Sequence, residues 1–223
     1  MTTLDARQQI LAANATAAAS LRERFAAAGT LVVNLISSPG SGKTTLLCTL
    51  ARQLAGTLRM AAIVGDIATE RDADRMRDAG LPAHQIVTGG CCHLDARMVD
   101  KALDVAGFGD VDLLFVENVG NLVCPANYDL GEAFKIVLLS TTEGADKPFK
   151  YPGIFSKADL AVLTKMDLLP YVSFDRAAVL EQIRTLRPNG RIVEVASTTG
   201  AGIPELARLL TDEVRSCRQA AQR

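Results

Sequence analysis

The hydrophobic positions of the chain fall into six short runs, and longer segments with helical spacing of apolar residues separate them. Most of the runs are continuous rather than alternating, which is typical of strands buried on both faces of a parallel sheet. The predicted strands cover residues 31–37, 60–64, 113–116, 136–139, 160–163 and 192–195. The predicted helices cover residues 4–28, 43–55, 69–79, 93–106, 175–187 and 203–219. This order predicts an α/β fold with a doubly wound, mostly parallel sheet.

Composition and charge argue against several classes of protein. With 223 residues, 48% of them hydrophobic, the chain is long enough to bury a core without disulfides or a structural metal. The net charge of −1 gives no reason to expect nucleic acid or an anionic membrane as a partner. No apolar run approaches the roughly 20 residues of a membrane span, and the first 24 residues lack the apolar core of a secretory signal. We therefore expect a cytoplasmic protein whose five cysteines are reduced.

A glycine-rich turn joins the first predicted strand to the following helix. Residues 37–44 match the phosphate-loop pattern G-x-x-x-x-G-K-[ST], except that Ser37 replaces the first glycine. The glycines let backbone N–H groups turn toward the phosphates, Lys43 can reach the β and γ phosphates, and Thr44 can offer its hydroxyl to Mg²⁺. We therefore predict a phosphate-loop NTPase fold, with nucleotide contacts from Ser38, Pro39, Gly40, Ser41, Gly42, Lys43, Thr44 and Thr45.

Carboxylates follow two other predicted strands. Glu117 stands where a Walker-B acid belongs, and the N–H of Gly120 can meet the γ-phosphate. Asp66 and Asp72 follow the strand at 60–64, and one of them is expected to touch Mg²⁺ or its water. Each can instead cap the helix at 69–79, and for Asp72 the two interpretations stay open. The predicted catalytic residues are Lys43, Asp66, Asp72 and Glu117, and the predicted Mg²⁺ ligands are Thr44, Asp66, Asp72 and Glu117.

The turn after the strand at 160–163 resembles the guanine-reading motif N-K-x-D, with Thr164 in the place of the asparagine. Asp167 can accept both N1–H and N2–H of guanine in bidentate fashion, whereas adenine offers no such pair of donors. The stem of Lys165 can cover the face of the base, and the loop after the last strand places Ser197 where a backbone N–H can read guanine O6. The motif predicts binding of GTP and GDP.

Two segments beside the predicted nucleotide site carry metal-ligating residues. Cys92 and His93 follow a short apolar run, and Cys124 lies in the loop after Glu117. Two thiolates and an imidazole suit Ni²⁺ or Zn²⁺. The spacing alone is a weak signal, because lone cysteines are commonly small core residues, but the location beside nucleotide-sensitive loops favours a metal site. Cys91 stays without an assigned role, and His84 is expected in a surface loop.

Taken together, these motifs resemble the HypB family of hydrogenase-maturation GTPases. The resemblance covers about residues 30–210 and rests on the phosphate loop, Gly65-Asp66, Cys92-His93, 117–125, Asp129-Leu-Gly131, Lys147-Pro-Phe-Lys-Tyr-Pro152 and 164–167. It implies slow GTP hydrolysis that times nickel delivery to a hydrogenase large subunit, and a Cys-His-Cys metal site at a nucleotide-dependent homodimer interface. It also implies a small zinc-binding accessory protein, HypA, as a partner. Some members carry an N-terminal cysteine motif or a His-rich stretch, and residues 1–30 here contain neither Cys nor His.

The expected organisation is one compact unit, with an N-terminal helix at 1–29 and a GTPase domain at 30–223. Three other functions remain open at this point. A urease-type nickel GTPase shares the Lys-Pro-x-Lys-Tyr-Pro stretch but uses a Cys-Pro-His metal motif, whereas Cys92 and His93 are adjacent. The others are a non-catalytic metal-binding scaffold with a structural nucleotide, and an ATP-dependent small-molecule kinase, which Asp167 disfavours.

Overall fold

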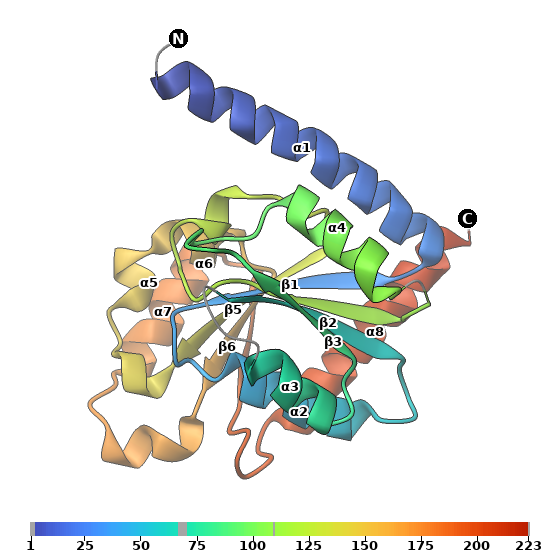
Figure 1. The fold of residues 1–223 in the computed structure, drawn as a ribbon. Coiled ribbons are helices and arrows are strands. Elements are labelled where there is room, and N and C mark those ends of the chain that lie inside the picture. The colour runs from blue at the N-terminus through green and yellow to red at the C-terminus, as the bar shows by residue number, and fades with distance from the viewer. Residues whose placement is uncertain (1–2, 67–70, 109, 223) are drawn as a thin grey trace.

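The computed structural model describes residues 3–66, 71–108 and 110–222, and these residues form a seven-stranded, all-parallel sheet with helices on both faces (Figure 1). The strands are β1 (Leu31–Ser37), β2 (Met60–Asp66), β3 (Ala83–Val87), β4 (Leu113–Glu117), β5 (Phe134–Ser140), β6 (Leu160–Thr164) and β7 (Arg191–Glu194). The helices are α1 (Thr3–Ala28), α2 (Lys43–Leu54), α3 (Arg71–Asp78), α4 (Ala96–Ala106), α5 (Lys147–Lys150), α6 (Pro152–Lys157), α7 (Arg176–Leu186) and α8 (Ile203–Ala221). This confirms the predicted α/β fold.

The strand order β3-β2-β4-β1-β5-β6-β7 places β1 in the middle of the sheet, between β4 and β5. Because all the strands are parallel, the loops that follow β1, β2, β4 and β6 meet at one edge of the sheet. The phosphate loop, the predicted Mg²⁺ ligands and the predicted metal cysteines all lie in or beside these loops.

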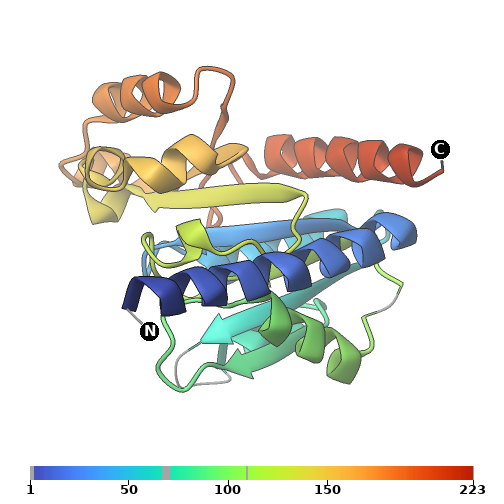
Figure 2. The same ribbon diagram turned by 90° about the horizontal axis from the view of Figure 1, so that it is seen from above.

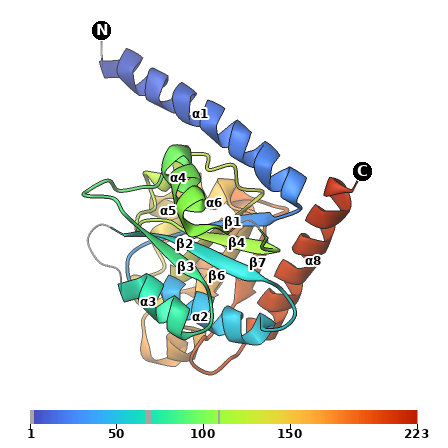
Figure 3. The same cartoon turned by 45° about the vertical axis from the view of Figure 1, so that its right-hand side comes forward.

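Alternate residues of the central strands face two separate layers of helices. Apolar residues of α2, α3 and α8 pack on one face, while α1 and α4 cover β1, β2 and β4 on the other. Helices α6 and α7 complete this second layer over β5 and β6. Figure 2 shows α1 lying across the sheet, and Figures 1 and 3 show its N-terminal end projecting beyond the rest of the fold. None of the helices in the described residues has the length and hydrophobicity of a transmembrane segment.

The sequence prediction missed strand β3 and the short helices α5 and α6, and it placed one helix start wrongly. Strand β3 carries His84 and Gln85 at the edge of the sheet and is only partly buried, so its pattern is not the continuous apolar run of a central strand. His84 therefore lies in a strand, and its prediction as a loop residue was wrong. Helix α4 begins at Ala96 instead of residue 93, because the Asp95 side chain caps it by accepting a hydrogen bond from the N–H of Met98 at 2.8 Å. The predicted start of the helix at 69–79 lies outside the described residues.

An ion-pair cluster ties the end of α8 to the start of β4. The Asp112 carboxylate, whose side chain is 6% exposed, accepts hydrogen bonds from the Arg59 guanidinium at 2.7 Å and also pairs with Arg218. Burial raises the pKa of Asp112, but the hydrogen bonds and charges of the two arginines outweigh it and hold the pKa below its usual value. The folded state therefore favours the ionised carboxylate.

We expect Asp112→Asn to lower the free energy of unfolding at neutral pH by about 2–4 kcal/mol, because it removes the charge of a buried carboxylate that two half-exposed arginines contact. Asp110 is a matched control, since it pairs with the same Arg59 but is 85% exposed, and Asp110→Asn should cost less than about 1 kcal/mol. A lowered folded-state pKa gives stability that is present above the unfolded pKa and is lost as the pH falls through the folded one. Urea unfolding should thus show wild type and Asp112→Asn converging below about pH 4; a gap that stays constant contradicts this.

Candidate functional site

The phosphate loop leaves the end of β1 at Ser37 and enters α2 at Lys43. Gly40 and Gly42 have φ angles of 77° and 93°, in the left-handed region that glycine adopts without strain. The Lys43 ammonium donates a hydrogen bond to Oγ of Ser37 at 2.9 Å, and the Ser41 hydroxyl donates to the Ser38 carbonyl at 3.0 Å. Ser37, the departure from the usual first glycine, thus holds the lysine across the loop.

Glu117 ends β4 directly beside the start of α2. The Thr44 hydroxyl donates to its Oε1 at 3.3 Å, while Oε2 is buried and has no hydrogen-bond partner within the described part of the chain. Burial raises the pKa of Glu117 to about 7, against the lowering effect of the Lys43 charge. A buried carboxylate oxygen without a partner, next to a hydroxyl oxygen, fits the oxygen ligands that Mg²⁺ requires. These residues are therefore able to hold a magnesium ion.

A cavity of about 530 Å³ opens above the phosphate loop. All four predicted catalytic residues line it, together with the predicted contacts Pro39, Gly40, Gly42, Thr44, Thr45, Gly120 and Lys165. Ser38 and Ser41 belong to the loop but do not line the cavity, and Ser41 is fully buried. Asp72 lies inside α3, so it is not the cap of that helix, and its side chain faces Arg75 at 3.4 Å.

Arg75 is a residue of this cavity that sequence reasoning missed. Its guanidinium lies 3.4 Å from Oδ1 of Asp72 and donates to the Thr45 hydroxyl at 3.3 Å. None of the sequence motifs points to an arginine, whereas Arg75 reaches the cavity from helix α3. The sequence did offer a signal for Arg75, because a residue three positions after Asp72 lies on the same face of a helix.

The turn predicted to read guanine packs against the phosphate loop. Thr164 takes the place of an asparagine, and its hydroxyl donates to the Ser41 carbonyl at 2.7 Å, so it still ties the two loops together. Lys165 has a φ of 56°, and its ammonium donates to the Thr142 hydroxyl at 3.3 Å. Asp167 accepts from the Thr198 hydroxyl at 2.9 Å, in the loop that also carries Ser197. Asp167 and Ser197 do not line the cavity, so their contact with a base stays a prediction.

The three predicted metal ligands come together from two loops. The ligand atoms of Cys92, His93 and Cys124 all lie within 4.8 Å of one another. The two sulfur atoms are 2.6 Å apart, and the ring of His93 stacks on Tyr128 with centroids 3.7 Å apart. Burial lowers the pKa of His93, which favours the neutral, ligating imidazole. Cys91 is exposed and does not belong to this group.

The protonation of the cysteines bears on metal binding. The hydrogen bond with Cys92 and then burial raise the pKa of Cys124, so its thiol is protonated at neutral pH in the structure without a cation. A divalent cation must displace that proton, because the thiolate is the ligand. The arrangement therefore predicts metal binding that strengthens as the pH rises.

Comparison with known proteins shows the family of the chain. Residues 31–194 match the family model described as CobW/HypB/UreG, nucleotide-binding domain. The chain is 50% identical over 198 residues to the hydrogenase maturation factor HypB of Azotobacter chroococcum, covering 89% of this chain and 65% of that protein. It is 46% identical over 202 residues to HypB of Escherichia coli K12, covering 91% of this chain and 70% of that protein.

A solved structure agrees in fold as well as in sequence. The crystal structure of HypB from Helicobacter pylori in complex with nickel superposes with a TM-score of 0.87 at 40% identity, covering 91% of this chain and 95% of that one. The chain belongs to the HypB family. It spans about 65% of the length of the Azotobacter HypB proteins, which are longer chains.

We expect Cys92→Ser, His93→Ala and Cys124→Ser each to weaken Ni²⁺ and Zn²⁺ binding at least about tenfold, since each removes one of three protein ligands. The neighbouring Cys91→Ser is the matched control and should bind like wild type, because Cys91 lies outside the group. Isothermal titration with each metal at several pH values measures both the loss and the expected gain in affinity with rising pH. If Cys91→Ser weakens metal binding as much as Cys92→Ser does, the ligands are assigned wrongly.

Proposed function

We propose that this chain is a GTP-hydrolysing metallochaperone that delivers nickel, or helps to insert it, during maturation of [NiFe]-hydrogenase. The observation that carries the proposal is the junction of two sites on one loop. Glu117 and Gly120 line the phosphate cavity, and Cys124 follows them within the same loop to meet Cys92 and His93. Family membership supports the biological role, and the nickel-bound relative from Helicobacter pylori supports nickel as the cargo.

The cavity supplies the parts of phosphoryl transfer to water. Lys43 binds the β and γ phosphates, and the loop N–H groups hold the phosphate oxygens. Asp167, in the turn beside the cavity, selects guanine. Thr44, Glu117 and one of Asp66 and Asp72 would hold Mg²⁺, which supplies charge neutralisation on the phosphates when bound. The buried Glu117 carboxylate and one of Asp66 and Asp72 also help to place the attacking water.

We propose that the intrinsic rate of GTP hydrolysis is slow. Arg75 is the positive charge beside the phosphates that the sequence did not predict, but its guanidinium is engaged by Asp72 and the Thr45 hydroxyl. An arginine held in this way must leave those partners before it can stabilise the transition state. A GTPase of this kind acts as a timer for metal transfer more than as a catalyst.

The metal site also bears on partners. Three protein ligands leave a position of a four-coordinate ion for a further donor, and Val123, beside Cys124, is 55% exposed. This supports the part of the proposal that a second copy meets the chain here in a GTP-dependent homodimer. A HypA-type zinc-binding accessory protein and the hydrogenase large subunit, directly or through others, complete the proposed set of partners.

We expect Arg75→Ala to lower kcat for GTP by roughly 10- to 100-fold, because it removes a positive charge from the cavity. Arg77→Ala is the matched control on the same helix, since Arg77 pairs with Asp74 and donates to the Ala83 carbonyl at 2.8 Å, away from the cavity. Steady-state phosphate release should be within about twofold of wild type for that variant. Similar losses in both variants would mean that Arg75 acts only through the packing of α3.

The proposed function is tested by measuring Ni²⁺ affinity with GDP and with a non-hydrolysable GTP analogue, each with Mg²⁺. Wild type should differ between the two nucleotide states by roughly fivefold or more, and Lys43→Ala should lose GTP turnover. Identical nickel affinities in both states sink the metallochaperone proposal and leave a scaffold with a structural nucleotide. In a deletion strain, failure of urease with normal hydrogenase would instead favour the urease-type alternative.

A further inference from the structure

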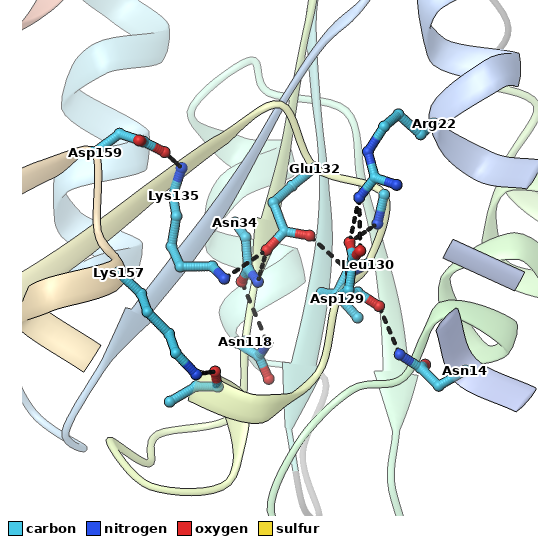
Figure 4. Close-up of polar contacts among 12 residues, drawn as sticks. Asn14, Arg22, Asn34, Asn118, Asp129, Leu130, Glu132, Lys135, Lys157 and Asp159 are labelled. Atoms are coloured by element: carbon cyan, nitrogen blue, oxygen red, sulfur yellow. Dashed lines mark hydrogen bonds and ion pairs between the residues drawn. The ribbon is translucent and has the colours of Figure 1, made fainter. Parts of the chain in front are cut away.

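Polar side chains form a buried chain of contacts from Asn118 through Asn34 to Glu132 and Lys135 (Figure 4). The Asn118 side-chain oxygen accepts from the N–H of Leu94 at 3.0 Å, and its amide nitrogen donates to Oδ1 of Asn34 at 3.2 Å. The Asn34 amide donates in turn to Oε1 of Glu132 at 3.0 Å, which also pairs with Lys135 at 3.1 Å. Asn34 and Asn118 are fully buried. The chain thus joins both ends of the 118–132 loop to the centre of the sheet.

The hydrogen-bonding capacity of each group determines which atom donates and which accepts along this chain of contacts. An ionised carboxylate only accepts hydrogen bonds, so Asn34 must turn its NH₂ to Glu132 and its oxygen to Asn118. Asn118 must then donate to Asn34 and keep its oxygen for the N–H groups of Leu94 and Val119, which both lie at 3.0 Å. The side-chain oxygen of Asn118 therefore has one defined orientation, toward the backbone of the segment that carries Cys92 and His93.

Leu94 is the point where this chain meets the metal site. It follows His93 directly and is fully buried. Its backbone N–H is held by Asn118, while its side chain packs on Gly65 so closely that a Cβ atom there would lie 2.8 Å from Leu94 Cγ. Both Asn118 and Gly65 line the phosphate cavity. The residue next to a metal ligand is therefore held by residues of the nucleotide site both at its backbone N–H and at its side chain.

We propose that Asn118 is the positioning residue that carries the state of the nucleotide to the metal site. It lies between Glu117 and Gly120, the residues expected at Mg²⁺ and the γ-phosphate, so a shift of this loop moves its side chain. The hydrogen bond to Leu94 then moves His93 relative to Cys124. The inference rests on the proposed function, because it needs both a nucleotide in the cavity and a metal at the Cys-His-Cys group.

Asn14 provides a control with the same chemistry and a different location. Its side-chain oxygen accepts from the N–H of Ala96 at 2.9 Å, and its amide donates to the Asp129 carbonyl at 2.8 Å. It therefore also ties the segment after His93 to the end of the 118–132 loop, and it is 6% exposed. However, Asn14 belongs to α1 and does not line the phosphate cavity.

The test compares Asn118→Ala and Asn14→Ala with wild type by titration with Ni²⁺ in the presence of GDP and of a non-hydrolysable GTP analogue. The readout is the ratio of the two dissociation constants, which a uniform loss of packing does not change. We expect a ratio of roughly fivefold or more in wild type and in Asn14→Ala, and a ratio within about twofold of one in Asn118→Ala. A wild-type ratio in Asn118→Ala overturns the inference.

A second measurement uses wild-type protein alone and stays informative if Asn118→Ala does not fold or binds no metal. Amide hydrogen exchange, resolved by NMR without nickel, follows the Leu94 N–H and the Ala96 N–H in the two nucleotide states. The exchange rate at Leu94 should change by about fivefold or more, while that at Ala96 should stay within about twofold. Unchanged exchange at Leu94, or an equal change at both amides, overturns the inference.

The two proposals fail in different ways. A wild-type protein that binds no nickel, or binds it equally in both nucleotide states, removes the proposed function itself. A wild-type protein with the expected ratio, together with an Asn118→Ala variant that keeps it, leaves the metallochaperone intact and removes only the assigned role of Asn118.

Discussion

Burial of the Glu117 carboxylate at the end of β4 is the constraint on which the site depends. An ionised carboxylate without full hydrogen bonding in a protein interior is costly, and the fold offsets this cost only in part, through the Thr44 hydroxyl and the nearby Lys43 charge. A divalent cation bound by the carboxylate would offset the rest of this cost. The parallel sheet makes this arrangement possible, since it brings the end of β4 beside the end of β1 and the start of α2.

The fold was predictable because its central strands are buried on both faces and therefore read as continuous apolar runs. Strand β3 escaped because an edge strand with His84 and Gln85 has no such run. The phosphate loop was equally readable, since glycine and lysine spacing reports backbone shape directly. Arg75 and Asn118 were not assigned, because their importance comes from tertiary neighbours: Asp72 and Thr45 for one, Leu94 and Asn34 for the other.

The metal site could be predicted from the sequence only in part. Sequence spacing gave only weak reason to join Cys92 and His93 with Cys124, which lies 32 positions further along the chain. Parallel topology brings them together, because β2, β3 and β4 are neighbours and their following loops share an edge. The ring of Tyr128 stacks on His93 at one side of the metal site. No sequence pattern predicts this contact.

The hydrogen bond from Thr164 to the Ser41 carbonyl has a consequence for selectivity. Thr164 ends β6 just before the turn predicted to read the base, and its side chain holds the phosphate loop. The predicted contacts with the base and with the phosphates are therefore coupled through this hydrogen bond. We expect a base that fits Asp167 poorly to strain the phosphate grip as well. Discrimination among nucleotides would then be partly kinetic, because a wrong nucleotide that is bound would also be misaligned for cleavage.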